Sequence, residues 1–228
     1  MPRPTEFVDE DWTSEQVQGI LDGDSVETHS RDMNKSDLQD ISEELGEDFE
    51  QMLLEAGSNV LASVGVDIRG EPDLTVVTSS EDIEHIERQL DTQENGVYLD
   101  EHDEVLVFTD RAARGLKDCD PVGTTAHELK HRDQHRRYQE DFDQLYPVRE
   151  ATTQLFNMYR DGKIDNESLR YEKVRKLAES DYDNPEELAE ETELAADCYG
   201  NLREQGLSKE EAMSFILNDY EERRVDNI

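Results

Sequence analysis

An excess of acidic residues is the property that most constrains how this chain can fold. Asp and Glu number 59 against 23 Lys and Arg, and the formal net charge of -36 is spread from end to end. Like charges at this density oppose a compact state, although salt screens their repulsion. Apolar residues nevertheless recur at regular spacing through most of the chain. This pattern favours a folded protein with an acidic surface over a disordered acidic chain.

The acidic surface also narrows the classes of partner. It is typical of proteins adapted to high salt, and it favours a haloarchaeal or haloviral origin. Nucleic-acid binding is not expected, because clusters of Lys and Arg are missing. The chain has no run of eighteen apolar residues, so no membrane span is expected. Its start, "MPRPTEFVDEDW", does not resemble a secretory signal. The expected location is therefore a high-salt cytoplasm, with association to a virion as the alternative.

The first half of the chain predicts helices and a small sheet. Residues 1–33 are expected to be loosely structured, and residues 34–228 to form one domain. Ser36 and Gln39 resemble a capping box that opens a long helix, with a break near Gly57 and a continuation towards Leu61. The following short elements are a strand, a helix capped by Ser80 and a hairpin of two strands, at 73–79, 80–90, 96–100 and 104–110.

The second half predicts helices only. A helical turn after Asp110 precedes a long helix from near Pro121 to about Phe142, and two helical stretches follow at 148–159 and 167–179. Asn184 is expected to cap the next helix, which ends near Gly206. Ser208 and Glu211 form a capping box for the last helix. The layout is α+β, with a small N-terminal sheet, then the long helix, then a mainly helical C-terminal half.

The long helix carries the motif HELKH. His127 and His131 are four residues apart, so they share one helix face and can bind one zinc ion. Glu128 points to the side of this pair, where it can act on a metal-activated water as the general base. The alternative is a solvated helix face with ordinary histidines. His135 extends the series, but in an unbroken helix it lies about 12 Å along the axis from His127. A packing or supporting role is therefore expected for His135.

A catalytic zinc requires a third protein ligand. The best candidate lies in "ETELAADCYG", where Glu193 and Asp197 share a helix face and two small alanines allow close approach. Glu193 is predicted as the ligand, and Asp197 as the acceptor for the second nitrogen of a zinc-bound histidine. Glu190 and Glu191 are the alternatives. In so acidic a chain, a purely solvated helix is a serious competing interpretation.

These residues resemble those of the glutamate-zincin metallopeptidases, in which HExxH is followed on a later helix by ExxAD. "HELKHRDQH" is also similar to the HExxHxxxH of the ImmA/IrrE-type peptidases. The resemblance covers about two dozen residues and implies a zincin-like fold with one zinc per chain. It implies that Glu128 is the base, that His127, His131 and Glu193 are ligands, and that Asp197 supports them. It also implies that the strand "EVLVFTD" binds the substrate as an added edge strand.

Two further choices stay open in the sequence. Tyr182 and Tyr199 are the two candidates for the group that stabilises the oxyanion. Cys119 and Cys198 are expected to be free thiols in a reducing cytoplasm, with a single bridge between them as the alternative.

The expected function is zinc-dependent hydrolysis of peptide bonds in a peptide or protein substrate. The alternative is a virion component or a regulator of host proteins that retains a zincin fold with little or no activity. A third interpretation is an acidic helical binding module in which the motif is accidental.

Overall fold

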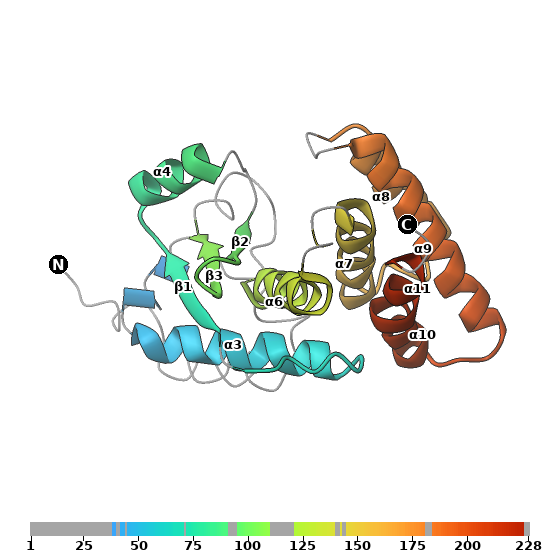
Figure 1. Cartoon of the computed structure of the whole chain (residues 1–228), viewed down its shortest axis with the longest axis horizontal. Coiled ribbons are helices and arrows are strands. Elements are labelled where there is room, and N and C mark those ends of the chain that lie inside the picture. The colour runs from blue at the N-terminus through green and yellow to red at the C-terminus, as the bar shows by residue number, and fades with distance from the viewer. Residues whose placement is uncertain are drawn as a thin grey trace. The chain divides into compact units, whose positions relative to one another are not determined.

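The computed structural model describes residues 38–39, 42–43, 45–70, 72–90, 95–109, 121–139, 142, 145–180 and 184–225. These residues form two compact units, divided after Val60, after Asp67 and after Arg132, with Leu61–Asp67 belonging to the C-terminal unit. The described residues form helices and one three-stranded sheet, which confirms the coarse α+β prediction (Figure 1). No helix among the described residues is both long and apolar enough to cross a membrane. The predicted segment 1–33 and the helical turn after Asp110 lie outside the described residues.

The first long helix, α3 (Glu47–Ala62), runs unbroken through Gly57, contrary to the prediction of a break there. A Cβ at Gly57 would lie only 2.8 Å from Thr125 Cγ2 and 3.2 Å from the backbone nitrogen of Ala126. Glycine is therefore needed for the close approach of α3 to α6 (Pro121–Tyr138). The change in backbone direction falls at Gly46 instead, where φ is +52°.

The sheet has the strand order β1-β3-β2 and contains β1 (Asp73–Val77), β2 (Gly96–Leu99) and β3 (Glu104–Phe108). The predicted hairpin is confirmed, because β2 pairs antiparallel with β3. β3 also pairs in parallel with β1, so it is the central strand and not an edge. Its side chains from Val105 to Phe108 are all buried, as expected for a strand covered on both faces.

Helix α4 (Ser80–Leu90) covers part of this sheet, with Ile83 packed in one buried cluster with Leu106 and Phe108. Its cap is Ser79, one residue before the predicted Ser80. The Ser79 hydroxyl oxygen accepts a hydrogen bond from the backbone N–H of Asp82 at 3.3 Å.

A buried arginine anchors α6 to the hairpin. The Arg132 guanidinium donates two hydrogen bonds to the Asp103 carboxylate, at 2.6 and 2.8 Å, and a third to the carbonyl of Arg69 at 2.8 Å. Arg132 is 1% exposed, and Asp103 sits in the β2–β3 turn with φ of 53°. The Tyr98 hydroxyl donates to the same carboxylate. This pair fixes where the helix lies along the sheet.

The second unit is entirely helical in its described part. Its elements are α7 (Tyr146–Arg160), α8 (Glu167–Ala178), α9 (Pro185–Glu204), α10 (Lys209–Phe215), the π-helix η5 (Ile216–Tyr220) and α11 (Glu221–Val225), together with the end of α6. α9 packs against α7 and α8, and Ala151, Leu177 and Leu188 form their shared core. The predicted Ser208–Glu211 capping box is confirmed. Asn184 precedes α9 as predicted but is left-handed, and its side chain makes no capping bond.

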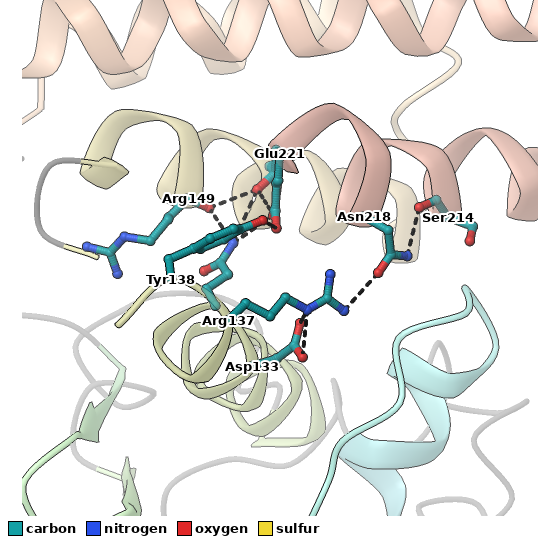
Figure 2. Close-up of polar contacts among 9 residues, drawn as sticks. Asp133, Arg137, Tyr138, Arg149, Ser214, Asn218 and Glu221 are labelled. Atoms are coloured by element: carbon teal, nitrogen blue, oxygen red, sulfur yellow. Dashed lines mark hydrogen bonds and ion pairs between the residues drawn. The ribbon is translucent and has the colours of Figure 1, made fainter. Parts of the chain in front are cut away.

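The buried carboxylate of Glu221 joins three elements of this unit (Figure 2). It accepts hydrogen bonds from Gln134 Nε2 at 2.7 Å, from the Thr152 hydroxyl at 2.5 Å and from the Tyr138 hydroxyl at 3.4 Å. Gln134 also donates to the carbonyl of Arg149 at 3.3 Å. The C-terminal end of α6 is thereby held against α7 and α11. α6 itself ends at Tyr138, a turn before the predicted Phe142.

We predict that Arg132→Met lowers the free energy of unfolding by about 1.5–3 kcal/mol, because the Asp103 carboxylate loses a charged, bidentate partner. Arg175→Met is the matched control. Arg175 pairs with Glu179 on an exposed helix face, so its replacement should cost about 0.5 kcal/mol or less. Urea denaturation at constant high salt measures both. Equal effects of the two substitutions would contradict the anchoring role of Arg132.

Candidate metal centre

The two histidines of HELKH face each other one turn apart on α6. Their Nε2 atoms are 3.0 Å apart, and their rings meet edge to face with centroids 4.6 Å apart. His127 is 8% exposed, and His131 is half-buried. Such a contact is either a hydrogen bond between one protonated and one bare imidazole nitrogen or a pair of ligands for one ion. The spacing predicted from the sequence is therefore realised on one helix face.

Glu128 is buried beside the edge strand β2. The side chain is 3% exposed, and its Cγ would lie 3.3 Å from a Cβ added at Gly96. The same Cβ would lie 2.6 Å from Thr124 Cγ2 and 2.7 Å from the carbonyl oxygen of Leu106. Gly96 therefore leaves room for the side chains of Thr124 and Glu128 on α6. A carboxylate removed from bulk water in this way is well placed to exchange a proton with a bound molecule.

A third candidate ligand is Glu150 on α7. Ligand atoms of His127, His131 and Glu150 all lie within 4.8 Å of one another. Glu150 is 4% exposed, and Gln154, one turn later, donates a hydrogen bond to its Oε1 at 2.5 Å. A buried carboxylate oriented by a neighbouring amide is a common arrangement around metal ligands. These three residues form a possible metal-binding triad.

The predicted ligand Glu193 is not part of this triad. Glu193 and Asp197 do share a face of α9, as predicted, but both are exposed. The buried face of α9 is formed by other residues, among them Leu188, Thr192 and Ala195.

The two alternative ligands are not part of the triad either. Glu190 is exposed. Glu191 is buried, but its carboxylate is engaged by the Arg224 guanidinium, at 2.5 and 3.0 Å, and by the Tyr220 hydroxyl at 2.6 Å.

Glu150 carries a signal that the sequence reasoning missed. It is the only acidic residue of α7, whereas α9 carries seven, at 186, 187, 190, 191, 193, 197 and 204. The residues around Glu150 are buried, from Val148 to Phe156. In so acidic a chain, a single carboxylate on a mostly buried helix stands out, because a buried charge is costly unless other groups stabilise it.

The remaining predicted residues lie elsewhere. His135 packs edge-on against Phe142, with ring centroids 4.8 Å apart, so it has the expected packing contact. Tyr199 is 1% exposed and donates a hydrogen bond to Asp165 at 3.4 Å; burial, with the nearby Asp165 charge, raises its pKa to about 12. Cys198 forms no disulfide with any described residue. Tyr182 and Cys119 lie outside the described residues.

Comparison with known proteins adds no relative. No protein-family model, curated protein or solved structure matches the chain.

We predict that Gly96→Ala lowers the free energy of unfolding by about 1–3 kcal/mol, because the new methyl group forces β2 away from α6. Gly200→Ala is the control. Gly200 lies within helix α9, and a Cβ there meets only Arg170 Nη1, at 3.9 Å. Because alanine favours a helix more than glycine does, the change should be neutral or stabilising by up to about 1 kcal/mol. Thermal and urea unfolding measure both. A harmless Gly96→Ala would show that the strand and helix are not tightly packed.

Proposed function

We propose that the chain is a zinc-dependent metallopeptidase with His127, His131 and Glu150 as ligands. The observation that carries this proposal is the gathering of their ligand atoms within 4.8 Å. Two imidazoles and one carboxylate are a common donor set for catalytic zinc, because they leave a position for water and substrate. Glu150 takes the place that the sequence reasoning gave to Glu193. The zincin-like fold remains part of the proposal.

The separation of the two histidines is close to that of two ligands of one zinc ion. Two zinc–nitrogen bonds of about 2.0–2.1 Å at a tetrahedral angle hold their nitrogens roughly 3.3–3.4 Å apart. The observed separation of the two Nε2 atoms is 3.0 Å. A small rotation of either ring reaches the required value, and no backbone movement of α6 is needed.

When bound, zinc supplies Lewis acidity that activates water and polarises the scissile carbonyl. Glu128 takes the proton of the attacking water and returns it to the leaving amine, the usual role of a carboxylate next to such a site. Its burial keeps bulk water from competing for that proton. Gln154 holds the Glu150 carboxylate in position.

The edge strand β2 is the place where an extended peptide fits. The predicted substrate strand, β3, is paired on both sides and cannot accept another strand. At the opposite edge, the Val76 N–H of β1 is already bonded to Glu50 Oε1 at 2.9 Å. No described strand pairs with the outer side of β2.

The residue of β2 that adjoins the proposed base also has outward backbone groups. The carbonyl of Asn95 accepts from the Phe108 N–H, so strand alternation turns the backbone groups of Gly96 and Tyr98 outward. Gly96 is the residue that adjoins Glu128. A peptide added to this edge would therefore lie alongside the strand that packs against the general base.

We predict that metal content distinguishes the two glutamates. Wild-type protein and Glu193→Gln should each hold about one zinc per chain, whereas Glu150→Gln should weaken zinc affinity by at least about 100-fold, because a direct ligand is lost. Elemental analysis after purification in high salt, followed by chelator competition, measures this. Loss of zinc from Glu193→Gln alone would restore the original assignment. No zinc in the wild type would favour a simple His127–His131 hydrogen bond.

We predict that Glu128→Gln lowers the rate of peptide hydrolysis by about 10²–10⁴-fold, because the general base is removed while its shape is kept. Zinc content should stay at the wild-type level, since Glu128 is not a ligand. Cleavage of a mixed peptide library, followed by mass spectrometry, gives the rate. Normal cleavage by this variant would refute the mechanism. Zinc binding without cleavage by the wild type would favour the interaction-protein alternative.

A further inference from the structure

The second unit contains a small cavity of about 260 Å³ between α7, α8 and the turn that joins them. Its lining comes from three places: Gln154, Asn157 and Met158 on α7; Asp161 and Lys163 in the turn; Leu169, Glu172, Lys173 and Lys176 on α8. Cavities that enclose drug-sized ligands usually exceed about 300 Å³. This one is therefore suited to a single functional group or side chain.

The charges that line the cavity leave one ammonium group in excess. Lys163 pairs with Asp161 at 2.6 Å, and Lys176 pairs with Glu172 at 2.8 Å. No acidic side chain in the described part of the chain forms an ion pair with Lys173, which is partly buried. Burial lowers the pKa of Lys173, and the charges of Glu150 and Asp161 oppose that shift.

Lys173 differs from Lys163 and Lys176, the other two lysines of the cavity, because it forms no ion pair with a described residue. With a net charge of -36, most surfaces repel anions and offer abundant partners to any lysine. A partly buried ammonium that forms no ion pair with a described residue can accept an anion from outside. Gln154 and Asn157 add side-chain amides, which can donate further hydrogen bonds to the same group.

The cavity is linked to the proposed metal centre through one residue. Gln154 lines the cavity and also donates to Glu150 Oε1 at 2.5 Å. The charge of Glu150 also acts on Lys173. A group bound in the cavity therefore lies one side chain away from the proposed ligand Glu150.

We propose that this cavity binds a carboxylate of the peptide substrate, through the ammonium of Lys173 and the amides of Gln154 and Asn157. This inference rests on the proposed peptidase function. The carboxylate belongs either to an acidic side chain or to the C-terminus of the peptide, since both present the same chemistry. The acidic surface repels such peptides elsewhere, so the cavity confers selectivity as well as affinity.

The test compares cleavage of three peptides of one sequence: one with Glu at a varied position, one with Gln there, and the Gln peptide with an amidated C-terminus. The varied position is scanned along the peptide. Wild-type kcat/KM should favour a carboxylate-bearing peptide by roughly tenfold or more, as for a hydrogen-bonded charge pair. Preference for Glu over Gln identifies a side chain, and preference for the free over the amidated end identifies the terminus.

Lys173→Met should reduce this preference at least fivefold, and Lys173→Arg should retain most of it. Lys209→Met removes the same charge from an exposed pair with Asp165 outside the cavity, and it should keep the wild-type preference. Circular dichroism checks that each variant is folded, and zinc content checks that each one holds its metal. An unchanged preference in Lys173→Met, or an equal loss in Lys209→Met, would overturn the proposal.

A binding measurement separates this inference from the proposed function. Titration of the full-length protein with N-acetylglutamate, followed by NMR, should show saturable binding in the wild type and at least tenfold weaker binding in Lys173→Met. If no peptide is cleaved yet this difference is seen, the peptidase function fails and the carboxylate site stands. If peptides are cleaved but N-acetylglutamate binds both proteins equally, the carboxylate site fails and the peptidase function stands.

Discussion

The burial of a polar helix is the constraint on which the rest of the structure depends. Between Pro121 and Gln134, α6 is almost wholly buried, although it carries two histidines and several charged residues. Each buried polar group needs a partner, because an unpaired one costs several kcal/mol. Arg132 finds Asp103 in the hairpin, and Gln134 finds Glu221 near the C-terminus. The buried polar side chains of α6 therefore depend on partners that lie far away in the chain.

Elements determined by local interactions could be predicted from the sequence. The capping box of Ser208 and Glu211 and the β2–β3 hairpin depend on residues a few positions apart, and both occur as expected. Features that depend on distant neighbours could not. A glycine within a helical pattern suggests a break, as at Gly57. Its real role, the close contact with Thr125, cannot be seen in the sequence. The central position of β3 follows from its parallel pairing with β1, about thirty residues earlier.

The residues of the candidate site also divide into those that local spacing predicts and those that depend on distant neighbours. His127 and His131 need only a helix to meet, so their spacing was sufficient. A third ligand depends on which helix packs beside the first, and a chain with 59 acidic residues offers many plausible choices. Glu193 was predicted because it shares a helix face with Asp197. An exposed acidic face produces the same pattern. Burial separates the candidates better than pattern, because Glu150 is 4% exposed whereas Glu193 is exposed.

An acidic surface also bears on metal selectivity. Solvated carboxylates on mobile side chains attract cations weakly and without geometric preference, and salt screens them over a few ångströms at molar ionic strength. Imidazoles in a fixed pair bind zinc through directional bonds that such carboxylates do not imitate. His127 and His131 are held by the backbone of one helix, and Glu150 is held by Gln154. In the proposed metal centre, specificity for one cation would therefore come from the few buried donors and not from the many exposed carboxylates.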